Sequence, residues 1–349
     1  MSTQVPLSPL PSRRAVAAGG AASLLALLTG CGAGASGSPA PAATTADVAQ
    51  GGSAFRTADT ATAALGSGAP DGEFPRTLVH AAGSTTIERR PQRVVVLDTG
   101  ELDAVLSLGV TPVGMGTTAG QTGLPSYLAE QVVGQVATVG PLDQIDLEAV
   151  AALRPDLVLG SALRVEELHP QLSQIAPTVL SYRPGFPWKE NLLLAGDALG
   201  VRGEAEALLA DHQARADALR AAVGATAPTI SLVRFMPGRI RLYGNLSFIG
   251  VVLDDAGLPR PAEQDVDDLA VEVSAETITR ADGDRLFYTS YGPVEATEEA
   301  AVLAGPLWGT IPAVAQGRAQ RVDDETWFLG LGYSGAVRVL DDLTRHLTA

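Results

Sequence analysis

One order of secondary-structure signals occurs twice along this chain, and it constrains the fold more than any other feature of the sequence. The order is a strand, a helix, a glycine and a proline, followed later by a capped helix, a turn and a second strand. The first copy covers residues 94–159 and the second covers residues 240–288. Strands that alternate with helices are typical of parallel sheets. The sequence therefore predicts an α/β protein with two similar α/β lobes.

The segments of both copies are short and well delimited. Apolar runs of strand length occupy 94–97, 157–159, 240–243 and 286–288. Helical spacing or a cap residue marks 101–108, 146–153, 247–256 and 274–280. Gly109 and Gly257 end the first helix of each copy, and a proline soon after each glycine prevents its continuation.

A helix of another kind lies between the two copies. Residues 203–223 have no internal proline or glycine, and about 20 helical residues span about 30 Å. That length suits a rigid bridge between two lobes, with a ligand cleft between them. In open α/β sheets, ligands bind beyond the carboxyl ends of the strands. This rule places candidate ligand contacts at 98–99, 161–164, 243–245 and 288–291.

Residues 1–31 have the layout of a lipoprotein signal peptide. A pair of arginines precedes an apolar stretch, 15–28, that is too short to span a bilayer comfortably and ends in small residues. The segment SRR at 12–14 resembles the twin-arginine export signal, although the usual Phe-Leu-Lys does not follow. The segment LTGC at 28–31 resembles the bacterial lipoprotein box, which implies that Cys31 is acylated. We expect an exported chain held on the outer face of the cell membrane by this lipid anchor alone.

Residues 32–73 are expected to form a flexible tether. Gly, Ala, Ser, Thr and Pro dominate most of this segment without periodicity, and such a composition cannot bury enough surface to fold. We expect the folded part to begin near Phe74. It should comprise an N-terminal lobe at 74–188, a helical bridge at 189–225 and a C-terminal lobe at 226–349.

Charge and residue usage exclude several classes of ligand. The formal net charge is −15, so the chain repels nucleic acid, and an anionic ligand needs a local basic pocket. Cys31 is the only cysteine, which excludes an internal disulfide and a multi-cysteine metal site. The four histidines are scattered, without the i, i+4 spacing of a helical zinc site. We therefore expect no directly bound metal and no resident cofactor.

Four segments resemble the iron-siderophore substrate-binding family of ABC importers, which shares its fold with the vitamin B12-binding protein. They are RRPQRVVVLDTGELDAVLSLGVTPVG, IDLEAVAALRPDLVLGS, LYGNLSFIGVVLDDAGLPRP and PLWGTIPAVAQGRAQRVDDETWFLG. The resemblance implies two lobes joined by one long helix, with little hinge closure and no chemistry on the ligand. It implies that the protein binds a ferric siderophore and docks on a membrane permease with its ATPase.

Arginines are the side chains expected to bind the ferric siderophore, because such a complex presents oxygen atoms and often carries negative charge. The candidates are Arg164 in the first lobe and Arg234, Arg239 and Arg241 in the second. Arg239 and Arg241 alternate with apolar residues, which predicts that they share one face; for Arg239 a solvated strand face fits equally well. Leu142 stands where some relatives carry an arginine, so the siderophore class stays open, although the cations favour an anionic or carboxylate-bearing complex.

Aromatic side chains are expected to cover the apolar flanks of the ligand. The candidates are Tyr243, Trp188, Tyr288 and Trp327, with Tyr182 as a further possibility. At least two of these rings are expected to pack in the core instead.

The resemblance also implies one exposed acid on each lobe that docks with arginines of the permease. Glu276, which follows the cap residue Ser274, is the candidate in the second lobe, and Glu166 or Glu167 is the candidate in the first. Acids in a first helical turn also stabilise the helix dipole, so this position has a purely structural explanation as well.

Three other functions have less support in the sequence. The same fold could bind haem or a corrinoid, but no histidine stands at a strand end as an axial ligand. A free metal ion lacks a His/Asp/Glu cluster. Gly332-Tyr333-Ser334-Gly335-Ala336 approaches the nucleophile elbow of a serine hydrolase, but a glycine is missing. The acid and histidine would have to come from the same terminal helix, so we expect no enzyme.

Overall fold

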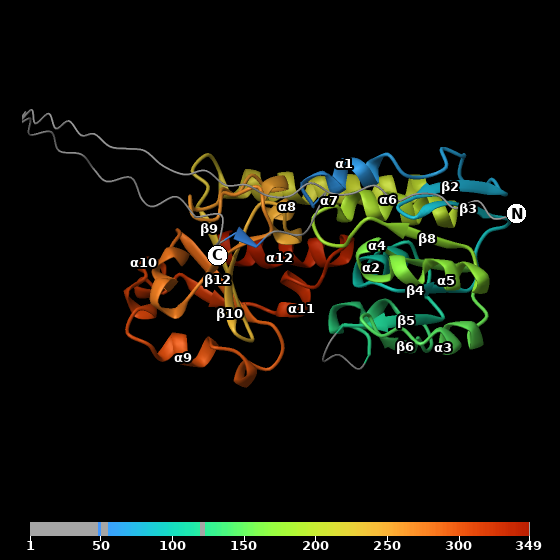
Figure 1. Ribbon diagram of the computed structural model, residues 1–349. Helices are drawn as coiled ribbons and strands as arrows, with labels where there is room; N and C mark the ends of the chain where they lie inside the picture. The colour runs from blue at the N-terminus through green and yellow to red at the C-terminus, as the bar shows by residue number, and fades with distance from the viewer. Residues whose placement is uncertain (1–47, 50–54, 119–122, 349) are drawn as a thin grey trace, which may run out of the picture. The chain divides into compact units, whose positions relative to one another are not determined.

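The computed structural model describes residues 48–49, 55–118 and 123–348 (Figure 1). The expected signal peptide and Cys31 lie outside these ranges. Across the described ranges, no helix combines the length and the apolar character that a membrane span requires. Two large sheets, one in each lobe, and a separate two-stranded sheet organise the described chain.

The first lobe is built on a five-stranded parallel sheet with the strand order β6-β5-β4-β7-β8. Its strands are β4 (Val94–Val96), β5 (Gly114–Thr117), β6 (Ala137–Pro141), β7 (Leu157–Ser161) and β8 (Thr178–Ser181). Every residue of β4, β7 and β8 is buried, as expected of strands that are covered on both faces. The parallel sheet predicted for this lobe is confirmed.

Short helices connect these strands. They are α2 (Thr99–Ser107), η2 (Ser126–Gln131), α3 (Leu147–Ala152), α4 (Ala162–Val165), η3 (Glu166–Leu168) and α5 (His169–Ile175), where η denotes a 3-10 helix. A hairpin of β2 (Arg76–His80) and β3 (Gly83–Ile87) precedes them. Helix α2 begins after Asp98, whose carboxylate accepts a hydrogen bond from Thr99 N at 2.8 Å. It ends before Gly109, whose φ of +73° suits glycine.

The second lobe contains a six-stranded sheet with the strand order β1-β11-β10-β9-β12-β13. Its strands are β1 (Val48–Ala49), β9 (Ile230–Met236), β10 (Arg239–Tyr243), β11 (Ala270–Val273), β12 (Arg285–Ser290) and β13 (Ala319–Arg321). Its helices are α8 (Phe248–Asp255), η4 (Ala275–Ala281), η5 (Val294–Ala296), α9 (Glu299–Ala304), η6 (Trp308–Thr310), α10 (Pro312–Ala315) and α11 (Asp324–Trp327).

The two sheets differ more than the repeated order of signals suggests. In the second lobe β9, β12 and β13 are parallel, but β10 and β11 run antiparallel to their neighbours. The reason is the short connection between β9 and β10, Pro237-Gly238, which is long enough only for a hairpin. Two α/β lobes are present, as predicted, but only the first has an entirely parallel sheet.

A layer of helices joins the lobes. It comprises α6 (Trp188–Leu199), α7 (Arg202–Val223) and α12 (Tyr333–Thr348). Helix α7 is the predicted bridge: it packs against α6 beside the first lobe and against α8 and α12 beside the second. The buried His212 shares a 2.9 Å hydrogen bond between its Nε2 and Asp255 Oδ2, which ties α7 to α8. Helix α12 also packs on α2 of the first lobe.

The folded part begins earlier than Phe74. Residues assigned to the flexible tether form η1 (Phe55–Thr57) and α1 (Ala58–Ala63), and α1 packs against α6. Gly66 then forms a β-bridge with Val79. The expectation of a flexible tether is wrong for residues 48–49, which pair with β11, and for residues 55–73. Phe55 and Ala58 find apolar partners on the two lobes that the local composition does not reveal.

Candidate ligand-binding site

A buried polar cluster lies at the carboxyl edge of the first-lobe sheet. Ser161, at the end of β7, donates from its Oγ to Asp98 Oδ2 at 2.6 Å. Ser181, at the end of β8, donates to Glu101 Oε1 at 2.6 Å. The strand-end rule predicted a site at 98–99 and 161–164, and the structure brings these two segments together.

The two carboxyl groups of this cluster differ in their environment. Burial, followed by the nearby Asp98 carboxylate, raises the pKa of Glu101 to about 8. Glu101 is therefore mostly protonated at neutral pH. Asp98 accepts hydrogen bonds from Thr99 N and Ser161 Oγ, and its Oδ2 lies 3.7 Å from Arg164 Nε. The Asp98 carboxylate of this cluster thus attracts the Arg164 guanidinium.

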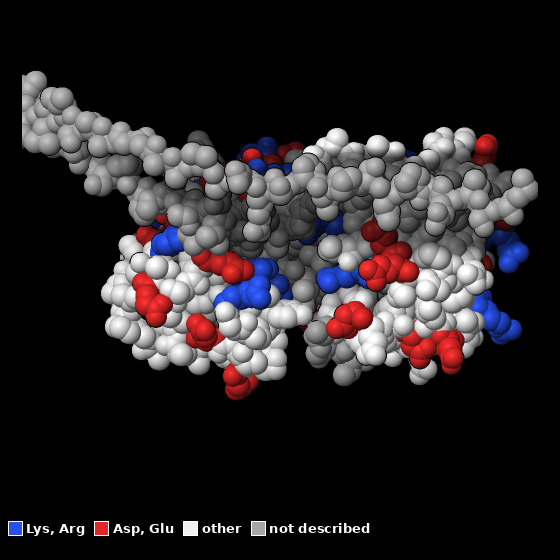
Figure 2. All heavy atoms as spheres, viewed as in Figure 1, with Lys and Arg blue, Asp and Glu red and all other residues white. Residues whose placement is uncertain are grey.

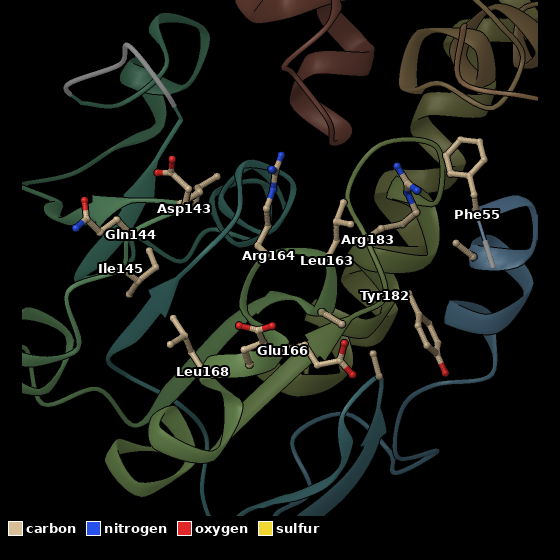
Figure 3. A pocket seen from close by; sticks show the side chains of 15 residues that line it. Phe55, Asp143, Gln144, Ile145, Leu163, Arg164, Glu166, Leu168, Tyr182 and Arg183 are labelled. Atoms are coloured by element: carbon tan, nitrogen blue, oxygen red, sulfur yellow. The ribbon is translucent and has the colours of Figure 1, made fainter. Parts of the chain in front are cut away.

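A cavity of about 660 Å³ opens at the loops that follow β6, β7 and β8. It is lined by 142–145, 162–164, 166–168, 182–183 and Ala81, together with Phe55 and Ala58 from the N-terminal segment. Figure 3 shows the side chains of Arg164 and Arg183 extending in the same direction, while Tyr182 points the opposite way. Leu142 also lines this cavity.

The two arginines form a local positive site in an acidic protein. The side chain of Arg164 is 43% exposed. Partial burial and then the neighbouring Arg164 lower the pKa of Arg183 to about 10, so the Arg183 guanidinium is still charged at neutral pH. Cations that repel one another favour an anion between or above them. Figure 2 shows basic groups on both flanks of a recess in the molecular surface.

Aromatic rings back the Arg183 guanidinium. Its Cζ lies 4.2 Å from the centroid of the Phe55 ring and 6.0 Å from that of Phe186. Phe55 and Phe186 pack edge to face, with centroids 5.2 Å apart. Sequence reasoning missed Arg183 and Phe55. The strand-end rule would have found Arg183 if 178–181 had been recognised as a strand; Phe55 carried no such signal.

The three second-lobe arginines form a separate cluster with carboxylates. Arg234 is 5% exposed and binds Asp324 with both arms, at 2.7 Å from Nε and 2.6 Å from Nη2. Arg239 and Arg241 both reach Glu272 Oε1, at 3.5 and 2.9 Å. The prediction that Arg239 and Arg241 share one face is therefore confirmed.

The positive and negative charges of this second cluster do not balance. Three guanidiniums face two carboxylates, Asp324 and Glu272, so one positive charge is in excess. Arg241 lies directly opposite Arg234 on the neighbouring strand. The ring of Tyr291, which sequence reasoning did not single out by itself, lies 4.7 Å from Arg234 Cζ. None of these residues lines the cavity of Figure 3.

Four aromatic candidates lie away from that cavity. Trp188 and Trp327 are 1% and 0% exposed, and both belong to the second hydrophobic core, where Trp327 Nε1 donates to Asp342 Oδ2 at 2.9 Å. Tyr243 is buried and its hydroxyl accepts from Arg234 Nη1 at 3.1 Å. Tyr288 packs edge to face on Trp308. Ligand contact by the two tryptophans does not fit this burial, because core packing covers both rings completely.

The acids considered for docking are exposed. Glu276 stands in the first turn of η4, where a hydrogen bond with the Ser274 side chain lowers its pKa. It borders a recess of about 380 Å³ with mainly apolar lining, which also includes Glu298. Glu166 and Glu167 open η3 and line the cavity of Figure 3. The first-lobe acids thus lie beside the ligand pocket.

The geometry around Ser334 does not resemble a hydrolase site. Its backbone N–H donates to Asp103 Oδ1 at 2.9 Å, and its hydroxyl lies 2.8 Å from Ser107 Oγ. His346 lies twelve residues further along the same helix, about 18 Å along the axis. That separation is too large for a nucleophile and its base. Within the described residues, no group of three His, Cys, Asp or Glu side chains is arranged to hold a metal ion.

Comparison with known proteins confirms the family resemblance. A family model described as "Periplasmic binding protein" matches residues 94–326. The "Probable siderophore-binding lipoprotein YfiY" of Bacillus subtilis is 35% identical over 284 residues, which cover 78% of this chain and 87% of that protein. The "Achromobactin-binding periplasmic protein" of Dickeya dadantii is 31% identical over 264 residues, with coverage of 73% and 86%.

A solved structure agrees with these relatives. The crystal structure of Staphylococcus aureus SirA complexed with staphyloferrin B has a TM-score of 0.70 and 30% sequence identity. The match covers 78% of this chain and 98% of that one. The described part of the chain therefore has the two-lobed fold of SirA.

Proposed function

Because the chain belongs to the periplasmic binding protein family, we propose that it captures a ferric siderophore outside the cell and delivers it to an ABC importer. The observation that carries this proposal is the pair of guanidiniums, Arg164 and Arg183, in an open cavity of a protein whose net charge is −15. Positive charge that is confined to one site of a negatively charged protein favours the binding of a compact anion at that site. The names of its relatives support the same cargo.

The chemistry of the pocket fits an anionic chelate. Planar guanidiniums donate several charge-assisted hydrogen bonds to carboxylate or other oxygen atoms of a chelator. Leu142 and Phe55 offer apolar contact in the same cavity. The iron enters as cargo that the chelator already holds, so the protein needs no metal ligand of its own.

The second lobe contributes the opposite side of the proposed cleft. Arg239 and Arg241 share one glutamate, Glu272, and one of them can turn to a ligand without leaving that carboxylate unpaired. Arg234 and Tyr243 form the buried base of this cluster. We propose that Arg241 and Arg239 meet the ligand and that Arg234 holds them in place through strand pairing.

Haem or a corrinoid is a poorer fit to this pocket. The residues that line the cavity of Figure 3 include no histidine, methionine or cysteine that could serve as an axial ligand. Binding of a preformed ferric chelate requires cationic and apolar side chains, and both kinds line the pocket.

The N-terminal segment supplies the proposed location. We propose that Cys31 carries the lipid anchor on the outer face of the cell membrane. Glu276 and Glu166 are proposed to dock on the permease, one from each lobe. Glu276 is exposed beside an apolar recess, a combination that suits a protein partner.

Direct titration tests the proposed cargo. The purified protein is titrated calorimetrically with hydroxamate, catecholate and carboxylate ferric siderophores, with haem and with cobalamin. We expect at least one anionic ferric siderophore to bind saturably and with one-to-one stoichiometry. The same chelator without iron should bind with lower affinity. Binding of haem or cobalamin without any ferric siderophore would overturn the proposal.

A further inference from the structure

We infer that the N-terminal segment 55–67, which lies within the expected tether, is a built part of the ligand pocket, and that Phe55 positions Arg183 for the ligand. The inference rests on the proposed function. It adds a specificity-determining residue outside the region that matches the family model, which begins at residue 94. Its basis is the set of contacts that this segment makes with both lobes.

The first contact is with the pocket itself. Phe55 and Ala58 line the cavity that Arg164 and Arg183 also line. Phe55 is 4% exposed, and its ring lies 4.2 Å from Arg183 Cζ. Figure 3 shows this ring beside the end of the Arg183 side chain. An arginine held against a ring face has fewer conformations, so less order is lost when a ligand binds.

The second contact is with the other lobe. Arg56 forms an ion pair with the buried Asp268, just before β11. Phe55, Ala58 and Phe186 form a small apolar cluster, against which Leu246, Val251 and Leu269 of the second lobe pack. The ring that supports Arg183 is therefore itself supported by residues of both lobes.

The third contact fixes the end of the segment on the first lobe. Ser67 donates from its backbone N to Asp197 Oδ2 at 2.5 Å and from its Oγ to Asp197 Oδ1 at 2.6 Å. Asp197 is buried and pairs with Arg76 at 2.9 Å. The segment is thus anchored near both ends, and Phe55 lies directly before the first anchor, Arg56.

Three variants in the full chain test this inference. Phe55→Leu keeps apolar volume but removes the ring, and Phe55→Tyr keeps the ring. The matched control is Phe74→Leu, because Arg76 Cζ lies 4.6 Å from the Phe74 ring, outside the pocket. We expect Phe55→Leu to weaken binding of the anionic ferric siderophore about three- to tenfold. Phe55→Tyr should bind within about twofold of the parent, and Phe74→Leu should leave Kd unchanged.

A double variant separates positioning from general packing. If Phe55 acts through Arg183, Phe55→Leu should have little further effect in an Arg183→Met background. If Phe55→Leu instead costs as much affinity in the Arg183→Met background as in the parent, the positioning role is contradicted. Unchanged affinity of Phe55→Leu with a normal melting temperature would also overturn the inference.

Hydrogen exchange of the ligand-free protein tests the inference independently of the cargo. Amides at 182–187 should exchange faster in Phe55→Leu than in the parent and in Phe74→Leu, because the loop loses its support. Equal exchange in all three proteins would refute the role of Phe55. If the parent binds no ferric siderophore, the proposed function fails, while this measurement still decides the positioning.

Discussion

At the residue scale, the Arg164–Arg183 pair concentrates positive charge where the first-lobe sheet ends. The pair survives in an acidic protein because Asp98 neutralises part of the charge from below and the Phe55 ring covers one face of Arg183. The Arg164 guanidinium still has hydrogen-bonding capacity for a ligand, since its ion pair with Asp98 is long, at 3.7 Å. A carboxylate or other anionic oxygen would complete this arrangement.

Replacing Arg164 or Arg183 by Gln should weaken binding of the ferric siderophore about ten- to a hundredfold. The reason is the loss of charge-assisted hydrogen bonds worth about 1.5–3 kcal/mol each, where about 1.4 kcal/mol is a factor of ten. Lysine should restore only part of the affinity, because it lacks the planar fork. Calorimetric titration measures the effect, with Arg202→Gln on the distant α7 as the control. Parent-like binding of both pocket variants would place the pocket elsewhere.

Glu101 should make stability depend on pH in a definite direction. Its pKa is about 8 in the folded protein and near 4.5 in the unfolded chain. Between these two pH values the folded state keeps a proton on Glu101 that the unfolded chain has lost. The contribution of Glu101 to the free energy of unfolding is therefore fully present below pH 4.5 and is lost as the pH rises through 8. The Glu101→Gln variant has no titrating carboxyl group at this position. Its free energy of unfolding should therefore rise by about 2–3 kcal/mol relative to that of the parent between about pH 5 and about pH 7.5.

Chemical denaturation at several pH values measures this difference. The exposed Glu88 provides the control, since Glu88→Gln should follow the parent at every pH. A constant difference between the parent and Glu101→Gln across the range would show that Glu101 is ionised in the folded protein.

At the element scale, one carboxylate of the first lobe caps a helix of the layer that joins the lobes. Asp103 on α2 accepts hydrogen bonds from the N–H groups of Ser334 and Gly335, at 2.9 and 3.1 Å, where α12 begins. Gly332 allows this approach, because a Cβ there would lie 2.5 Å from Asp103 Cγ. The cap joins α2 and α12 in a region with no room for a larger side chain.

Removal of this cap should destabilise the fold more than removal of an ordinary cap. Asp103→Ala leaves the part-buried N–H of Ser334 and the buried N–H of Gly335 without this partner, so we expect a loss of about 2–4 kcal/mol in the free energy of unfolding. Asp146 caps α3 within the first lobe at an exposed position, and Asp146→Ala should cost about 1 kcal/mol. Urea denaturation compares them. Equal losses would mean that the contact between α2 and α12 adds nothing to the cap.

The elements themselves were largely predictable from local sequence. Strands β4 and β7, helices α2, α3 and α8, and the bridge α7 all coincide with predicted segments, because apolar runs, caps and glycine stops act locally. Pairing was not predictable in the same way. The antiparallel placement of β10 depends on the tight Pro237-Gly238 turn, which the repeated order of signals obscured.

At the scale of the whole molecule, the proposed membrane attachment through Cys31 can be tested directly. Cys31→Ser should move the protein from the membrane fraction to the medium or periplasm, because no acyl chain can be added. Cell fractionation with immunoblotting measures this, and mass spectrometry of the parent should find a lipid on Cys31. Ser36→Ala, just beyond the lipoprotein box, is the control. Membrane retention of the Cys31→Ser variant would reject this anchor.

Docking should be separable from ligand binding. Glu276→Ala should leave the Kd for the ferric siderophore unchanged but reduce iron uptake by cells several-fold, since Glu276 is exposed and lies outside the pocket. Uptake of radioactive iron measures the effect. Glu204→Ala, an exposed acid in the first turn of α7, is the matched control for helix-dipole effects. Reduced ligand affinity in Glu276→Ala would contradict a docking role.

The sequence by itself determined the α/β class, the two lobes, the bridging helix and the placement of Asp98 and Arg164 at strand ends. Periodicity, caps and turns are local properties, so they can be read before the chain folds. The family resemblance added the class of cargo. The expected cargo also directed attention to the arginine cluster of the second lobe, although without its carboxylate partners.

Only the tertiary structure decided which side chains meet. It buried Trp188 and Trp327 in the core, and it set Arg183 beside Arg164. It also carried Phe55 from an apparent tether onto the pocket. Long-range contacts such as that between Phe55 and Arg183 join residues 128 positions apart, and no local pattern encodes them. The pocket is therefore a property of how the N-terminal segment packs beside the loops of the first lobe.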